Sequence, residues 1–170
     1  MGNTGMHPII EPLDVDYYSQ AAEWIADPDI NRWLYAEWRE RPVDEKLIAV
    51  VAMNNKNRLF LIRDGGDPVG LAAISQINDI DSHASIWYLL GDKSRSGKGI
   101  ATVAIGLLVK HAFETLGIHS LEASVAEPNM ASRRILEKNY FQSSGCLREA
   151  FQYDGTFVDR IIYDRINTGA

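Results

Sequence analysis

The chain has 170 residues, of which 46% are hydrophobic and 24% charged, a composition typical of one globular domain with a buried core. A net charge of −6 argues against nucleic acid as a partner, because binding phosphates needs a basic surface, and it favours cationic partners instead. No apolar stretch is long enough to span a bilayer, no signal-peptide pattern opens the chain, and Cys146 is the one cysteine. We therefore expect a cytoplasmic protein without membrane contact.

The first third of the chain favours helices. Its polar start, residues 1–6, is expected to be disordered, and one domain is expected over residues 7–167. A short strand over 7–13 should end near Pro12. Apolar residues at spacings of three and four, and proline at helix starts, predict three helices after it. These cover residues 16–27, 27–38 and 42–55.

From residue 58 onward, short apolar runs separated by turn residues are typical of antiparallel strands. The turn Gly65-Gly66-Asp67-Pro68 predicts a hairpin between the first two runs. We expect strands over residues 58–64, 69–77 and 83–91.

The remaining residues alternate helices and strands. A long helix is expected from about Gly97 to Leu116, ended by Gly117. After it we expect a strand over 118–126, a helix over 128–139 and a final hairpin that turns at Asp154-Gly155.

The long helix has a consequence for the sheet. As a crossover between strands 83–91 and 118–126, it makes these two strands parallel, whereas the hairpins are antiparallel. The predicted fold class is α/β (α+β): one domain with a mixed, mostly antiparallel sheet and helices on both faces.

The segment SRSGKGIATVAIG, residues 94–106, places two glycines and two cations where this helix should begin. A P-loop is excluded, because five residues rather than four separate Gly91 from Gly97-Lys98 and Gly99 replaces the required hydroxyl. A dinucleotide fingerprint fits poorly, because Thr102 stands at its third glycine. A third pattern, Arg/Gln-x-x-Gly-x-Gly/Ala, matches from its second residue onward.

The physical basis of that third pattern is the start of the helix. The first N–H groups of a helix lack internal partners and carry positive charge, and glycine lets a pyrophosphate approach them. Arg95 and Lys98 add charge. The alternative is a glycine-bearing loop with two solvated cations.

A second stretch supports a binding function. Pro128-Asn129, Ser132 one turn into a helix, and Phe141 opening the next strand resemble the other half of an acetyl-CoA site. Together, residues of about 69–166 resemble the core of the GNAT superfamily of acyl-CoA-dependent N-acyltransferases. The segments PNMASRRILEKNYF and GCLREAFQYDGTFVDRIIYDRI look most like the branch with ribosomal-protein N-terminal alanine acetyltransferases.

The resemblance implies a binding mode for acetyl-CoA as co-substrate. Strands 83–91 and 118–126 would splay apart and hold the pantetheine arm, with an N–H near Leu89 or Leu90 polarising the thioester carbonyl. Asn129 would bind pantetheine, or alternatively cap its own helix. The implied cofactor-binding residues are Leu90, Gly91, Arg95, Ser96, Gly97, Lys98, Gly99, Ile100, Ala101, Asn129 and Ser132.

The resemblance also implies direct attack of an amine on the thioester. The implied catalytic residues are Ser132, which would protonate the departing thiolate, and Glu149, which would serve as base through a water molecule; Glu122 competes for the second role. The alternatives are a solvated serine and a solvent-facing strand residue. The sequence has no cluster of Cys, His and Asp with the spacing of metal ligands, so we expect no metal site.

The sequence departs from the family pattern at three positions. Ser96 replaces an Arg or Gln, Tyr140 replaces a glycine, and Leu136 stands where many members carry a tyrosine general acid. The last departure leaves the acid role to Ser132 or water.

The acceptor is less defined by the sequence. We expect a primary amine: a protein or peptide N-terminus first, an amino sugar, polyamine or antibiotic second. The acceptor pocket, or alternatively a core cluster, would use Trp33, Tyr35, Trp38, Phe151 and Tyr153. A catalytically silent acyl-CoA sensor and a nucleotide-dependent enzyme stay open as alternatives, and a homodimer is compatible with the sequence.

Overall fold

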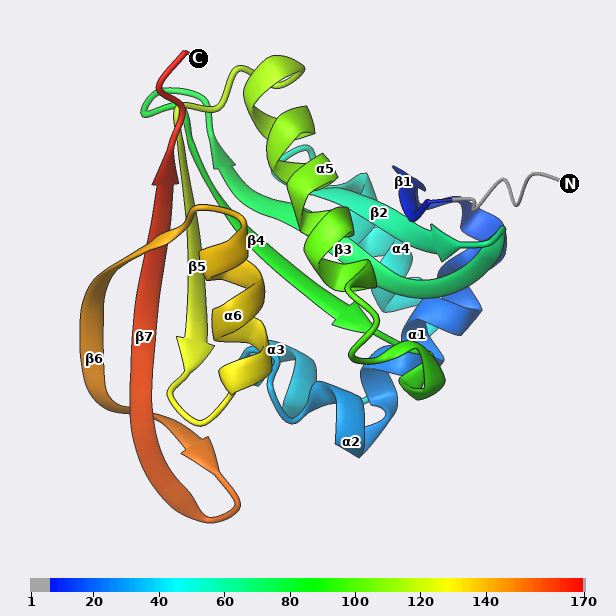
Figure 1. Cartoon of the computed structure of the whole chain (residues 1–170). Helices are drawn as coiled ribbons and strands as arrows, with labels where there is room; N and C mark the ends of the chain where they lie inside the picture. Colours follow the sequence, from blue (N-terminus) through cyan, green and yellow to red (C-terminus); the bar gives the residue numbers. More distant parts are fainter. Residues whose placement is uncertain (1–6, 170) are drawn as a thin grey trace, which may run out of the picture.

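The computed structural model describes residues 7–169, so the expected disorder of residues 1–6 lies outside the described residues. Its centre is one seven-stranded sheet with the order β1-β2-β3-β4-β5-β7-β6 (Figure 1). The strands are β1 (Ile9–Pro12), β2 (Arg58–Asp64), β3 (Asp67–Asn78), β4 (His83–Leu90), β5 (Ser120–Ala126), β6 (Gln142–Tyr153) and β7 (Thr156–Ile166).

Helices cover both faces of this sheet. They are α1 (Tyr18–Ala26), α2 (Pro28–Asn31), α3 (Ala36–Arg39), α4 (Glu45–Met53), α5 (Ile100–Glu114) and α6 (Met130–Lys138), with 3₁₀ turns η1 (Val15–Tyr17) and η2 (Lys93–Arg95). In Figure 1, α5 and α6 lie on the near face, and α1 and α4 lie behind the sheet. The predicted fold class is confirmed.

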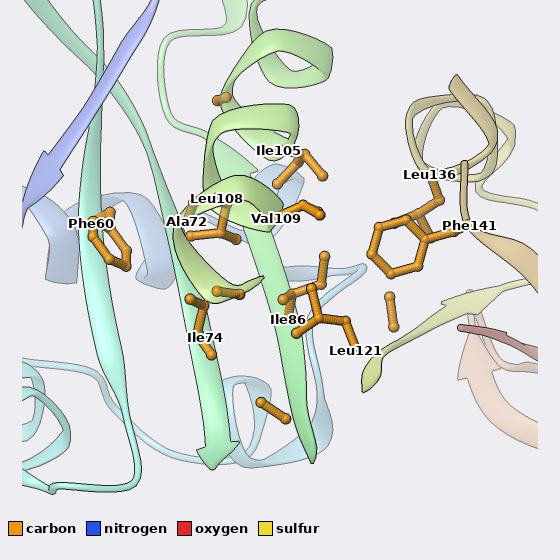
Figure 2. Packing of buried hydrophobic residues seen from close by; sticks show 14 of the residues in the cluster. Phe60, Ala72, Ile74, Ile86, Ile105, Leu108, Val109, Leu121, Leu136 and Phe141 are labelled. Carbon is orange, nitrogen blue, oxygen red and sulfur yellow. The ribbon is translucent and has the colours of Figure 1, made fainter. Parts of the chain in front are cut away.

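Alternation along β4 builds two cores, one on each face. Ala84 and Ile86 join α5 in the larger core, and Trp87 and Leu89 join α1 and α4 in the other. Figure 2 shows the first core, in which α5 residues face β3 and β4 and Leu136 of α6 points toward the same cluster.

One sheet contact is unusually short. β4 and β5 are the only parallel neighbours in the sheet of residues 7–169, and they pair at three positions, ending at Ser85 opposite Glu122. β4 then continues to Leu90 and β5 to Ala126, so the two strands diverge (Figure 1). This is the splayed parallel pair that the family resemblance implied.

The prediction of one helix over residues 27–38 was wrong, because this segment forms the two short helices α2 and α3. Asp27 caps α2 by accepting from the Asp29 N–H at 2.9 Å, but the helix ends at Asn31. Beyond it, Trp33 stacks on Tyr153 with ring centroids 4.4 Å apart, whereas Trp38 is buried against Trp87. Tertiary packing of the aromatic rings therefore overrides the local helical pattern.

The end of β4 is held by a tight contact with α1. A Cβ added at Gly91 would lie 2.1 Å from Trp24 Cδ2, so Gly91→Ala must displace the indole ring. We expect the substitution to lower the free energy of unfolding by about 1–3 kcal/mol in urea denaturation.

Gly145→Ala is the matched control, because its Cβ would meet nothing closer than 3.9 Å. We expect it to change the free energy of unfolding by less than about 0.5 kcal/mol. Equal losses in the two variants would contradict the role of the Trp24 contact.

Candidate active site

The gap between β4 and β5 presents unpaired main-chain groups from β4. Gly91 donates its N–H to the Val69 carbonyl at 2.9 Å, which fixes the phase of the antiparallel ladder with β3. Because bonded and non-bonded pairs alternate, Leu89 also points its N–H toward β3, whereas Tyr88 and Leu90 point theirs into the gap. Of Leu89, Leu90 and Gly91, only Leu90 therefore directs its N–H into the gap.

The β5 side of the gap follows the same rule. Glu127 donates its N–H to the Asp159 carbonyl at 2.8 Å, so Val125 and Ala123 pair with β7. The main-chain groups of Ser124 consequently face β4, across the gap. Two facing rows of backbone donors and acceptors line the divergent strands.

The glycine loop lies next to this gap, at the start of α5. The helix begins at Ile100 rather than at Gly97, because Gly97 and Gly99 have left-handed backbone angles, φ 77° and 81°. An added Cβ at either glycine would meet nothing within 4 Å, so the space in front of the loop is open. Gly99 is the N-cap residue of α5, and no side chain accepts a hydrogen bond from the amides at this helix start. Within residues 7–169, the N–H groups of Ile100 and Ala101 donate to no acceptor.

Arg95 is bound within the protein itself. Its guanidinium donates to Asp64 at 2.6 Å and to Asp67 at 2.9 Å, which ties the loop to the β2–β3 hairpin. The hydrogen bond with Asp64 raises the pKa of Arg95. Lys98 is exposed and forms no ion pair with any residue in 7–169, so it is the loop cation that is available to phosphate.

The start of α6 contributes two of the predicted residues. Asn129 caps the helix, because its Oδ1 accepts from the Ser132 N–H at 3.2 Å. Ser132 Oγ lies 2.6 Å from the hydroxyl of Tyr88, which projects from β4 across the gap. Desolvation raises the pKa of Tyr88, so its phenol stays protonated.

Tyr88 is the residue that sequence reasoning missed. It stands in an apolar strand and belongs to no motif, so only its alternation with Leu89 marks it as facing the helix side. The contact with Ser132 joins positions 44 residues apart, which the sequence pattern does not report.

A cavity of about 570 Å³ connects these parts. Its walls include Ser96 and Ala101 beside the glycine loop, Tyr88 and Ser132 in the gap, and Phe151 at the far end. The further lining residues at that far end are Arg32, Trp33, Tyr35 and Arg160.

The predicted aromatic pocket residues divide into two sets. Trp33, Tyr35 and Phe151 line the cavity, and Ser124 donates to the Tyr35 hydroxyl at 3.2 Å. Trp38 is a core residue, and Tyr153 supports Trp33 from behind by stacking.

The structure does not bring the predicted bases to Ser132. Glu149 is exposed in a bulge of β6 with φ 52°, where its N–H donates to Asp159, and it does not line the cavity. Glu122 lies at the closed end of the gap, 3.9 Å from His83. Among residues 7–169, the carboxylate that does line the cavity is Asp29, and it is paired with Lys93 at 2.8 Å.

The structure places two of the departures from the family pattern. Leu136 is fully buried in the core and also borders the cavity, so this position presents an apolar side chain there. Tyr140 has φ 60°, a left-handed angle that glycine adopts without strain, and its exposed ring stacks under Arg165 at 5.5 Å.

The comparisons with known proteins agree with this geometry. Residues 7–142 match the family model of the acetyltransferase (GNAT) domain. The chain belongs to the GNAT acetyltransferase family. The family predicted from the two motifs is thereby confirmed.

Relatives in this family differ in the share of the chain that they match and in the activity that their names give. The probable N-acetyltransferase YjcK of Bacillus subtilis is 39% identical over 84 residues, 49% of this chain and 46% of that protein. The chain thus matches less than half the length of this relative. The E. coli ribosomal-protein-serine acetyltransferase is 26% identical over 109 residues, 64% of this chain and 60% of that protein.

Solved structures share the fold over the whole length. The RimL ribosomal L7/L12 alpha-N-protein acetyltransferase in complex with coenzyme A has a TM-score of 0.83 at 19% identity, and covers 97% of both chains. The spermidine N-acetyltransferase of Vibrio cholerae, in complex with CoA and spermine, has a TM-score of 0.83 at 20% identity, over 94% of this chain and 95% of that chain.

Two further findings concern residues 7–169. No helix in this range is both long and apolar enough to cross a membrane. No group of three or more His, Cys, Asp or Glu side chains in the same range is placed to hold a metal ion.

The glycine loop generates a prediction about coenzyme A. Gly99→Asp places a carboxylate beside the free helix amides, where it repels pyrophosphate, so we expect the affinity for coenzyme A to fall at least about tenfold in calorimetry.

Gly117→Asp is the control, because Gly117 has φ 66° and the same open surroundings at the other end of α5. Its affinity should equal that of the unsubstituted protein. An unchanged affinity in Gly99→Asp would exclude the loop as the phosphate site.

Proposed function

We propose that the chain is an acetyl-CoA-dependent N-acetyltransferase in which a primary amine attacks the thioester directly. The observation that carries the proposal is the contact of Tyr88 with Ser132 inside a gap whose one end is the uncapped start of α5. Such a site offers amides for phosphates, free backbone groups for an extended arm and hydroxyls for a reacting sulfur. Membership of the GNAT family supports the same reaction.

The cofactor would be held by the residues at the gap and the loop. The amides from Gly97 to Ala101 and the Lys98 ammonium would bind pyrophosphate, and Ser96 borders the cavity beside them. Leu90 and Ser124 would bind the pantetheine arm through backbone groups. Asn129 Oδ1 accepts from the Ser132 N–H of its own helix, and its Nδ2 amide would donate to this arm.

Arg95 and Gly91 would act indirectly. The ion pairs of Arg95 with Asp64 and Asp67 hold the loop in place rather than leave a charge free for phosphate. Gly91 allows Trp24 to pack against the end of β4, next to Leu90.

The proton transfer would run through the Ser132 hydroxyl. Its Oγ lies 2.6 Å from the Tyr88 hydroxyl, where either oxygen can be the donor, and the Tyr88 O–H also donates to the Ser132 carbonyl at 3.2 Å. When Tyr88 donates to Oγ instead, the serine hydroxyl proton is free for the sulfur. As the C–N bond forms and the C–S bond breaks, Ser132 gives this proton to the thiolate and takes the one released by the attacking nitrogen. Products are then the N-acetyl amine and free thiol, with Ser132 restored.

The lack of a nearby base favours an acceptor that loses its proton easily. Deprotonating an α-amine of pKa near 8 at pH 7 costs about 1 kcal/mol, whereas a lysine-like amine costs about 4–5 kcal/mol. Within residues 7–169, Asp29 is the lining carboxylate, and Lys93 neutralises it. We therefore propose a protein or peptide N-terminal amine as acceptor.

One observation favours a second function, a catalytically silent acyl-CoA sensor. Glu149 lies outside the cavity, and Leu136 offers no acid. Thiol release from acetyl-CoA, measured with peptides, spermidine and amino sugars beside calorimetry of acetyl-CoA, separates the two. Turnover with a peptide amine supports the proposal, and binding without turnover on any amine supports the sensor.

The hydroxyl pair generates a kinetic prediction. Ser132→Ala should lower kcat by about a hundredfold, because general acid–base groups contribute on that order, with little change in acetyl-CoA affinity. Tyr88→Phe keeps the ring but removes the hydroxyl that contacts Ser132 Oγ, so kcat should fall by a smaller factor.

Tyr163→Phe is the matched control, because it removes a buried tyrosine hydroxyl that bonds Arg133 and Glu137 rather than Ser132. It should lower stability without lowering kcat. Ser132→Ala with the kcat of the unsubstituted enzyme would remove Ser132 from the reaction.

A further inference from the structure

Three arginines gather at the far end of the cavity, around the aromatic residues that line it. Arg160 of β7 lies 5.8 Å from the centroid of the Tyr35 ring and 6.0 Å from that of Phe151. Arg32 lies 5.4 Å from the Trp33 ring. Arg160 and Arg32 both line the cavity.

The third arginine supports the same wall from behind. Arg39 lies 4.5 Å from the centroid of the Phe151 ring and donates to the Gln152 carbonyl at 3.3 Å. Its Nε is buried and has no hydrogen-bond partner among the described residues. A buried donor without an acceptor is costly, so Arg39 adds a positive charge and an unsatisfied donor behind this wall.

None of these guanidinium groups is neutralised within the described part of the chain. Arg63, Arg95 and Arg133 each have an ion pair with a carboxylate. Arg32, Arg39 and Arg160 have none among residues 7–169. Five other arginines also have no ion pair in this range, and what distinguishes Arg32 and Arg160 from them is that they line the cavity.

The carboxylate of Asp29 in the cavity lining does not offset the charge of Arg32 and Arg160. Asp29 lines the cavity, but Lys93 lies 2.8 Å from it and also 3.1 Å from Asp27. The hydrogen bonds with Asp29 and Asp27 raise the pKa of Lys93, which stays charged. The acceptor end therefore carries uncompensated positive charge in an otherwise acidic protein.

We infer that the acceptor carries an anionic group next to its reactive amine, and that Arg160, with Arg32, binds this group. The inference rests on the proposed amine acetylation. For a peptide acceptor, the anionic group is the carboxylate of an acidic residue close behind the N-terminus, which a planar guanidinium can bind through two parallel hydrogen bonds. A polycationic amine such as spermidine would meet like charge at the same place.

The test uses three peptides that share an N-terminal alanine and differ at the second residue: glutamate, glutamine or lysine. We expect the glutamate peptide to have a kcat/KM about tenfold to a hundredfold above that of the lysine peptide, since hydrogen bonds between charged groups have this worth. Thiol release from acetyl-CoA measures each rate.

The deciding variant is Arg160→Glu, which should reverse the order and make the lysine peptide the better acceptor. A gain on the lysine peptide cannot come from a misfolded protein, and the affinity for acetyl-CoA should stay unchanged. Arg148→Glu is the control, because Arg148 is exposed on β6 of the same hairpin and does not line the cavity. It should keep the original order.

The outcomes separate the anion-binding role of Arg160 from the proposed amine acetylation. Equal rates on the three peptides, or a preference for the lysine peptide or spermidine, would overturn the anion-binding role while amine acetylation stands. An unchanged order in Arg160→Glu would overturn it as well. Turnover of none of the acceptors, with acetyl-CoA still bound, would overturn the proposed function together with this inference.

Discussion

The short pairing between β4 and β5 is the constraint on which the site depends. Three paired positions hold the strands together at one end, and beyond Ser85 and Glu122 each strand keeps one edge without a partner. Buried main-chain groups need hydrogen-bond partners, so such an edge in the middle of a sheet is stable only with a ligand or water beside it. The fold thus contains a slot of strand width, into which an extended molecule can bind as an additional strand.

The other parts of the site are arranged around this slot. α5 starts at one end of it, with amides that its own backbone leaves free. α6 places Ser132 against Tyr88 within it, and the hairpin of β6 and β7 places Arg160 at the end away from the glycine loop. A helix start, a hydroxyl pair and an arginine therefore follow one another along the cavity, which is the order that phosphate, thioester and acceptor require in an acetyl transfer.

Local patterns in the sequence predicted much of this arrangement. The hairpin turns, the crossover helix and the glycine loop each depend on residues close together, and all of them form, with α5 starting at Ile100 instead of Gly97. The prediction of one helix over residues 27–38 was wrong, because contacts of Trp33 and Trp38 with distant rings decide its course. Tyr88 and Arg160 were missed for the same reason, since their roles arise from partners in other elements. Glu149 was predicted from its strand position, but a bulge turns this part of β6 away from the cavity.

The central claim is that acetyl-CoA occupies the slot between β4 and β5 and bonds to its free main-chain groups. Amide hydrogen exchange of the individual residues, with and without acetyl-CoA, tests this most directly. We expect exchange to slow at Tyr88, Leu90, Ile100 and Ala101 on binding, while the amide of Leu89, which faces β3, changes little. Protection confined to other parts of the chain, with the amides of the slot exchanging as fast as before, would contradict the account.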